Sequence, residues 1–352
     1  MSRAGCWIID NYEFKACPEP GRTFSCVASL HNHSSHSLEN LATLNRVVTF
    51  SYMRPFRRLL QRSFGLAQEQ NLSYADLKYH PPFAPAELYR MELAGVRRLG
   101  INRMVFAITD HDEFAGGLDL LHGCDGHRAS IALGEELSVR FQDHVFHLGI
   151  TGLQEAGITG VHNRLQSAAR EGRFDDLFES LRALGCLVVL NHPLLPWSGQ
   201  SLQQIPILDL LARFGGAIHA LEYTGMRSRA ENDEVLKLAR QVGKPLVGGG
   251  DSHLLAASSI LCASAQAKDS SDFIDEIKSG RAIPLVKRDY HAPLGWKMFL
   301  RVLSFIAQYR KIAYYRGKPV ESIIGRDWIL LDPIGIAARA FLRVTSTLGW
   351  LR

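Results

Sequence analysis

The chain has 352 residues, of which 46% are hydrophobic and 21% charged, and it carries a formal net charge of +5. This composition is typical of a globular protein with one large domain and an appendage, and it argues against a disordered or repetitive chain. Six cysteines occur without a CxxC pair, and no apolar run is long enough to cross a bilayer. These features predict a reduced, cytoplasmic protein.

The N-terminal part of the chain does not show a regular pattern at first. Residues 1–22 are expected to form an irregular lead-in, and the first buried strand is expected over 26–30. Residues 40–82 then separate this strand from its helix at 85–100, where a short connection would suffice. They predict a long insertion in the first βα loop, partly helical and a candidate lid or specificity element.

Short apolar strands alternate with helical patterns from residue 25 to residue 286. Further strands are expected at 103–109, 130–133, 144–150, 186–190, 217–223, 244–249 and 281–286. Further helices are expected at 174–185, 202–215 and 229–243. This alternation indicates βα units and a mostly parallel sheet. Seven or eight such units in about 260 residues favour an α/β fold of the closed-barrel kind over an open sheet.

Charge marks a boundary near residue 287. Residues 287–352 hold twelve Lys and Arg against four Asp and Glu, a balance of +8, whereas the preceding residues hold 28 against 31. We expect a basic, mainly helical C-terminal extension over 287–352, in which 296–311 forms a helix packed on the barrel or on a partner subunit. Contact with a membrane surface is the alternative for this helix. A second basic, aromatic stretch covers 46–62, and either basic segment could bind nucleic acid or simply form a solvated helix face.

Polar side chains follow seven of the predicted strands at the point where each strand ends. They are His31, His33, His36 and Glu39; Asp110 and His111; Glu135 and Glu136; His144 and His147; Asn191 and His192; Glu222; and Asp251 and His253. Each has an ordinary structural explanation when taken alone, such as a helix cap. Because the carboxyl ends of parallel strands converge on one face, the whole set predicts a polynuclear metal site. Imidazole mixed with carboxylate suits Zn, Mn or Fe better than Ca or Mg.

At these residues the sequence resembles the polymerase and histidinol phosphatase (PHP) family of phosphoesterases. The segments that carry the resemblance are, in the family's order, "LHNH", "TDHD", "GEE", "HLG", "NHP", "LEY" and "GGDSH". They span roughly residues 25–286. The resemblance implies a distorted (βα)7 barrel, which we assign to residues 23–286, and two or three divalent metal ions (Mn, Zn or Fe).

The resemblance also implies which residues hold these ions. The first ion would be held by His31, His33, Glu136 and Asp251. Glu136, which matches the third position of the family's GxE better than Glu135, would bridge to a second ion held by His147 and His192. His111 and His253 would hold the third ion with one more ligand. There the chain reads "SHSLEN" where the family has an "SDG"-like turn, so Glu39 is the first candidate and His36 the next.

These features predict a metal-dependent phosphoesterase that acts on a small phosphomonoester, such as a nucleotide or nucleoside bisphosphate. His253 or Asp110 could protonate the leaving alkoxide. Arg227 and Arg229 are candidate phosphate contacts or, equally, exposed arginines at a helix start. Two alternatives stay open, a nuclease acting on oligonucleotides or single-stranded nucleic acid and a metal-binding regulatory protein without turnover.

Overall fold

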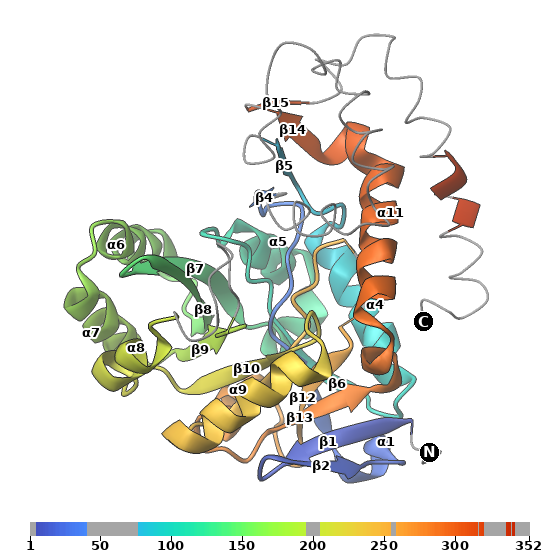
Figure 1. Cartoon of the computed structure of the whole chain (residues 1–352), viewed down its shortest axis with the longest axis horizontal. Helices are drawn as coiled ribbons and strands as arrows, with labels where there is room; N and C mark the ends of the chain where they lie inside the picture. The colour runs from blue at the N-terminus through green and yellow to red at the C-terminus, as the bar shows by residue number, and fades with distance from the viewer. Residues whose placement is uncertain are drawn as a thin grey trace. The chain divides into compact units, whose positions relative to one another are not determined.

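The computed structural model describes residues 5–40, 77–194, 205–254, 258–315, 317–319, 336–338 and 340–341. The chain divides into two compact units, whose elements are labelled in Figure 1. The first unit comprises Met1–Ser37, Phe83–Ser252 and Ala256–Ala292. The second comprises Leu38–Pro82, His253–Leu255 and Pro293–Arg352.

One sheet of the first unit has six strands in the order β2-β1-β13-β12-β3-β6. Their bounds are β1 (Cys6–Asp10), β2 (Glu13–Ala16), β3 (Cys26–Ser29), β6 (Arg103–Phe106), β12 (Ile260–Ser264) and β13 (Ile283–Lys287). Only β3 and β6 run parallel, and the other neighbours are antiparallel. The interior of this sheet is apolar, since Val27, Phe106 and Leu285 have no exposed surface. Burial of such side chains contributes about 2 kcal/mol each.

The other sheet of the first unit has five strands in the order β11-β10-β9-β8-β7. Their bounds are β7 (Leu133–Phe141), β8 (His144–Leu153), β9 (Leu187–Asn191), β10 (Ala220–Thr224) and β11 (Leu246–Gly249). Strands β9, β10 and β11 run parallel, as their connection through helices predicts. Strand β8 is antiparallel to both of its neighbours.

Helices connect and cover these strands. They are α1 (Pro20–Thr23), α4 (Pro85–Arg97), α5 (Ala115–Gly123), α6 (Ile158–Arg170), α7 (Phe174–Leu184), α8 (Ile207–Phe214), α9 (Arg229–Val242) and α10 (Ser270–Lys278), with 3-10 turns at Asp125–Ser130 and Arg288–His291. The helix predicted at 229–243 begins with a reciprocal capping box between Ser228 and Glu231. It ends at Gly243, whose φ of 64° is the left-handed geometry that glycine adopts without strain.

The predicted closed (βα)7 barrel is wrong in two respects. The segment predicted as separate strands at 130–133 and 144–150 is a hairpin, in which only Gln142 and Asp143 connect β7 to β8. A connection of two residues permits antiparallel pairing only, so this pair is not a βα unit. Moreover, no ladder in the described part of the chain joins β6 to β7 or β11 to β12, and the sheet does not close. The fold is a mixed α/β arrangement of two sheets.

The irregular lead-in predicted for residues 1–22 is also wrong. Strands β1 and β2 form a hairpin around Asn11 and Tyr12, both with positive φ, and β1 pairs with β13. A two-residue turn with positive φ at both positions matches the twist of the flanking strands. The N-terminal hairpin therefore extends the first sheet to its outer edge.

The second unit contains a short sheet and a long helix within the described residues. Its elements are β4 (Glu39–Asn40), β5 (Leu77–Tyr79), α11 (Leu294–Ile312), β14 (Ala313–Tyr315) and β15 (Lys318–Pro319). Helix α11 covers the predicted helical segment 296–311. Most of the predicted insertion at 40–82, including the basic stretch 46–62, lies outside the described residues. Among the residues that the structure describes, no helix is long and apolar enough to cross a membrane.

Candidate metal centre

The predicted site lies where the two sheets of the first unit meet. An isolated parallel bridge joins His111, just after β6, to Glu136 in β7. A second bridge joins Asn32, just after β3, to Ser252, just after β11. These bridges bring the ends of strands from both sheets to one place. Because β8 runs antiparallel to β9, its first half lies at the same place, and His147 pairs with Asn191 at the end of β9.

The carboxylate of Glu136 is the centre of this cluster, and both of its oxygens face imidazole nitrogens. Oε2 lies 3.2 Å from His31 Nε2, 3.3 Å from His33 Nε2 and 3.2 Å from His111 Nδ1. Oε1 lies 3.1 Å from His192 Nε2 and 3.4 Å from His147 Nδ1. Oδ1 of Asp251 lies 3.7 Å from His31 Nε2 and 3.6 Å from His33 Nε2.

These residues fit divalent metal ions. Glu136 is fully buried, and its Oε2 makes no hydrogen bond within the described residues although three imidazoles surround it. A buried carboxylate oxygen without a hydrogen bond is costly, and coordination to a cation would satisfy it. Within the first unit, three groups offer ligand atoms within 4.8 Å of one another: His31, His33 and Asp251; His31, Glu136 and His192; and His111, Glu136 and His147. The structure thus also places His111, predicted for the third ion, beside Glu136.

The electrostatics of the metal-free cluster are those of a mixed imidazole and carboxylate site. Burial alone would raise the pKa of Glu136, but the positive charges of His31, His111 and His147 hold that pKa well below its ordinary value. Burial alone would lower the pKa of His31, but Glu222 and Glu136 raise it well above its ordinary value. A metal ion that binds Nε2 of His31 would therefore compete with protonation of that ring.

Backbone geometry at two predicted ligands is unusual. His192 has a φ of 28° and Asp251 a φ of 46°, in the region that L-residues with a side chain rarely adopt. Such strain costs about 1–3 kcal/mol per residue and persists where surrounding contacts hold it. His192 follows directly on β9 and Asp251 lies two residues after the end of β11, and the side chains of both residues reach the cluster at the strand ends.

Asn191 and Glu222, which belong to the predicted set of strand-end residues but were not assigned to an ion, support the cluster. Asn191 Nδ2 donates to Glu136 Oε1 at 2.8 Å. Gly149 in β8 leaves room for this amide, because a Cβ there would lie 2.7 Å from Asn191 Oδ1. The signal that could have found Asn191 is its place immediately before His192 at the end of a buried strand.

Asp110 makes contacts that position the chain after His33, and its role as a general acid stays a prediction. Its side chain is fully buried, and its two oxygens accept hydrogen bonds from Ser34 N at 2.5 Å and Ser34 Oγ at 2.7 Å. Gly116 is required beside this pair, since its Cβ would collide with the Asp110 carboxylate. Asp110 thereby holds the turn that follows His33.

We expect Asp110→Ala to lower the free energy of unfolding of the metal-free protein by about 3 kcal/mol, because two buried donors lose a charged acceptor. Urea denaturation followed by circular dichroism measures this, with the exposed Asp209→Ala as the control. Unchanged stability combined with lost turnover would instead support the general acid role predicted from the sequence.

The remaining predicted residues are distributed as follows. Glu39 and His253 both belong to the second unit, where Glu39 Oε2 lies 3.0 Å from His253 Nε2. Their joint role with His111 at a third ion stays a prediction, as does the general acid role of His253. His36 Nε2 instead lies 2.8 Å from Asp119 of α5, which favours Glu39 over His36 as the further ligand.

The two candidate arginines both contact other side chains of the protein. Arg227 forms an ion pair with Glu231 at 3.1 Å. Arg229 lies over the ring of Phe14, with its Cζ 4.5 Å from the ring centroid. The position of Arg227 three residues after β10 keeps it as a candidate phosphate contact, whereas the stacking of Arg229 on Phe14 explains that residue structurally.

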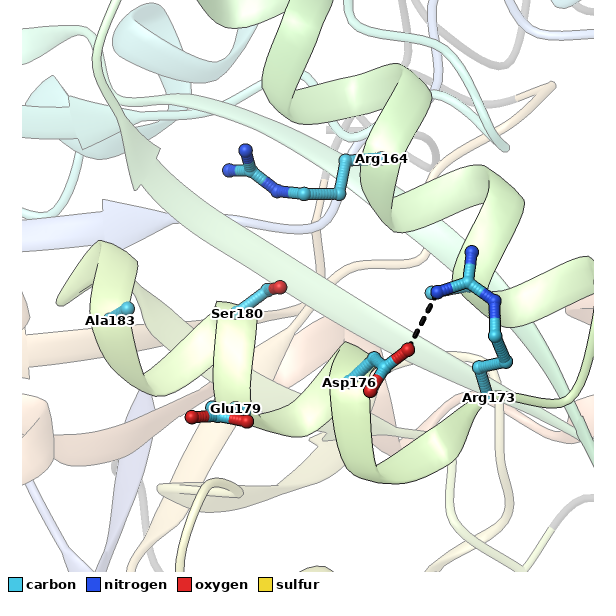
Figure 2. Close-up of a pocket in the computed structure, with 7 residues that line it drawn as sticks. Arg164, Arg173, Asp176, Glu179, Ser180 and Ala183 are labelled. Carbon is cyan, nitrogen blue, oxygen red and sulfur yellow. Dashed lines mark hydrogen bonds and ion pairs between the residues drawn. The ribbon is translucent and has the colours of Figure 1, made fainter.

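A surface hollow of about 370 Å³ lies between α6 and α7 (Figure 2). Arg164, Arg173 and Asp176 are among its lining residues, and Arg173 donates to Asp176 at 2.7 Å. None of the cluster residues lines it. The hollow is therefore separate from the cluster, and its two arginines are matched in number by two carboxylates, Asp176 and Glu179.

Comparison with known proteins finds similarity at the level of structure alone. No family model and no curated protein matches the sequence. A Bifidobacterium adolescentis protein inferred to be a metal-dependent phosphoesterase is similar at 14% identity and a TM-score of 0.37, over 57% of this chain and 92% of that chain. A two-domain Bacteroides vulgatus protein containing a predicted PHP-like metal-dependent phosphoesterase is similar at 13% identity and a TM-score of 0.41, over 62% and 65%. A Chromobacterium violaceum amidohydrolase with bound sulfate and no metal is similar at 18% identity and a TM-score of 0.34, over 50% and 84%.

Two of these solved structures are thus described as metal-dependent phosphoesterases, one of them as PHP-like, and both are similar to this chain at low identity.

Proposed function

We propose that this chain is a metal-dependent phosphoesterase with at least two divalent ions bound around Glu136. The observation that carries the proposal is the single buried carboxylate whose two oxygens face five imidazoles. His31, His33 and Asp251 with Oε2 of Glu136 would hold one ion, and His147 and His192 with Oε1 would hold the other. Bound divalent ions would lower the pKa of a water molecule and offset the charge of a phosphoryl group.

The burial of the cluster residues indicates on which side an anionic ester would bind. Glu136 and His33 are fully buried, whereas the His111 side chain is 18% exposed and that of Asp251 14% exposed. A substrate would therefore approach on the side of His111 and Asp251. Burial of the remaining groups keeps water away from them and strengthens their electrostatic interactions.

We propose a small phosphomonoester, with nucleotides and nucleoside bisphosphates as the first candidates. The test is phosphate release by the Mn²⁺-loaded protein from nucleotides, bisphosphonucleotides, sugar phosphates and histidinol phosphate. We expect turnover that falls at least about a hundredfold in His192→Ala, because the ion on the Oε1 side loses a ligand.

Other results of this assay would redirect the proposal. Cleavage of oligonucleotides whose affinity drops steeply with salt would instead support a nuclease. A protein that binds metal and turns over none of these esters would support a metal-binding regulatory protein.

A further inference from the structure

Glu222 is a buried carboxylate at the end of β10 that contacts residues from two other strand ends. Glu222 is buried, with only 1% of its surface exposed. Oε1 lies 2.6 Å from His31 Nδ1, and Oε2 accepts a hydrogen bond from the backbone N–H of His192 at 2.8 Å. One carboxylate thus touches a predicted ligand on the Oε2 side of Glu136 and another on the Oε1 side.

The contact with His31 sets which ring nitrogen faces the cluster. A carboxylate at Nδ1 favours the tautomer or ion with a proton on that atom, which leaves Nε2 to act as a ligand. Nε2 of His31 indeed faces Glu136 and Asp251, at 3.2 Å and 3.7 Å. The ring is therefore held from behind by Glu222 and points its other nitrogen into the cluster.

The contact with His192 acts on the backbone instead. His192 has a φ of 28°, a strained conformation that requires contacts to hold it. A charge-assisted hydrogen bond from its N–H to Glu222 supplies such a contact. With the backbone fixed in this way, the His192 ring reaches Glu136 Oε1, with Nε2 at 3.1 Å.

Gly249 in β11 makes room for Glu222. A Cβ at this position would collide with Oε1, Cδ and Cγ of the Glu222 side chain. Strands β10 and β11 pair at Thr224 and Gly249, so the carboxylate lies across the neighbouring strand. The glycine at position 249 therefore leaves the space that the Glu222 side chain occupies.

We infer that Glu222 is a positioning residue that couples the two sides of the metal centre, so that one substitution weakens binding of both ions. The inference rests on the proposed function. Glu222 need not touch either ion, since it acts through the ring of His31 and the backbone of His192.

The test is calorimetric titration of Mn²⁺ into the full-length, metal-free protein and its Glu222→Gln variant. A glutamine offers one acceptor oxygen where two donors require one each, so at least one of the two contacts is lost. We expect the affinity for both ions to fall about 10–100-fold, the usual effect of losing such a support. His192→Ala should weaken mainly the ion on the Oε1 side, and this difference separates coupling from the loss of one ligand.

Glu276→Gln is the matched control. Glu276 is also buried and accepts a hydrogen bond from Ser264 Oγ at 2.5 Å, and its contacts within the described residues are with Ser264 and Arg281 rather than with the cluster. We expect its Mn²⁺ affinities to equal those of the unchanged protein. Equal affinities in Glu222→Gln, or weakening of one ion alone, would overturn the inference. An unchanged protein that binds no Mn²⁺ would overturn the proposed function instead.

A measurement without substitution at Glu222 covers the case in which Glu222→Gln does not fold. In the Zn²⁺-loaded protein with ¹⁵N-labelled histidine, we expect the His31 ring to carry its proton on Nδ1, hydrogen-bonded to Glu222. A His31→Gln sample assigns the signal. A ring protonated on Nε2 would overturn the inference.

Discussion

Glu136→Gln is expected to lower phosphoesterase activity at least about a thousandfold. The variant is also expected to lose the ability to bind two ions at the same time. The Glu136 carboxylate faces His33 with one oxygen and His192 with the other. An amide lacks the negative charge and one of the two acceptor oxygens, so the Oε1 side loses its anionic ligand and the Oε2 side keeps only Asp251. A thousandfold loss corresponds to about 4 kcal/mol, which is in the range expected for loss of metal-based charge stabilisation.

Glu135→Gln is the control that the sequence itself provides. Glu135 precedes Glu136 in β7, is equally buried, and receives His162 Nδ1 on its Oε2 at 2.7 Å. Because side chains alternate along a strand, Glu135 points away from Glu136. We expect Glu135→Gln to retain activity and metal stoichiometry, both measured in parallel by phosphate release and metal analysis. If the two variants lost activity equally, the assignment of Glu136 as the shared ligand would be wrong.

The residues of the cluster could be predicted because their positions are encoded locally. An apolar strand followed at once by His, Asp or Glu is legible in one sequence, as at His111 after β6 and His192 after β9. The family resemblance, not the strand ends alone, implied the grouping of His31, His33 and Asp251, which the structure brings together.

Strand direction was not encoded in the same way. The turn between β7 and β8 uses Gln142 at a φ of 52°, without the Asn-Gly or Gly-Gly pair that makes a hairpin visible. The consequence is that His147 enters the cluster from the first half of an antiparallel strand. The prediction thus placed His147 at the cluster but gave the wrong direction to the strand that carries it.

Contacts between supporting residues far apart in the chain could not be predicted from the sequence, for a related reason. Glu222 and His31 are 191 positions apart, and nothing local at either residue indicates their 2.6 Å contact. The same holds for Asp110. The segment "TDHD" suggests a reactive acid at this position, but the Asp110 carboxylate accepts two hydrogen bonds from Ser34. Polar residues that support a site and those that face a substrate have the same sequence signature, and only the packing separates them.

Metal affinity is expected to rise with pH because the cluster holds a proton where a metal ion must bind. The pKa of His31 lies well above its ordinary value of 6.5 owing to Glu222 and Glu136, although burial opposes the shift. At pH 7 the metal-free protein therefore binds more protons than its metal-loaded form. Each proton released raises the apparent affinity about tenfold per pH unit below the folded-state pKa. Titration of Mn²⁺ between pH 6 and pH 8, in buffers of different ionisation enthalpy, measures both the slope and the number of protons released.

The free energy of unfolding of the metal-free protein should instead fall as pH rises, opposite to the metal affinity. A folded-state pKa above the unfolded value stabilises the fold fully below pH 6.5, and this contribution is lost as pH rises through the folded-state pKa of His31. The lowered pKa of Glu136 acts on the acid side, where its contribution is present above pH 4.5 and lost as pH falls through the folded-state value. The increase in Tm on adding Mn²⁺ should therefore grow from pH 6 to pH 8.

His162→Gln separates this effect from the titration of histidines in general. The pKa of His162 is also raised, chiefly by its hydrogen bond to Glu135, but His162 lies outside the cluster. Its substitution should change the pH dependence of stability in the metal-free and metal-loaded proteins alike, and leave the Mn²⁺-induced difference in Tm as it was. A difference in Tm that does not depend on pH in the unchanged protein would mean that the ions bind without displacing a proton, and hence that His31 is not a ligand.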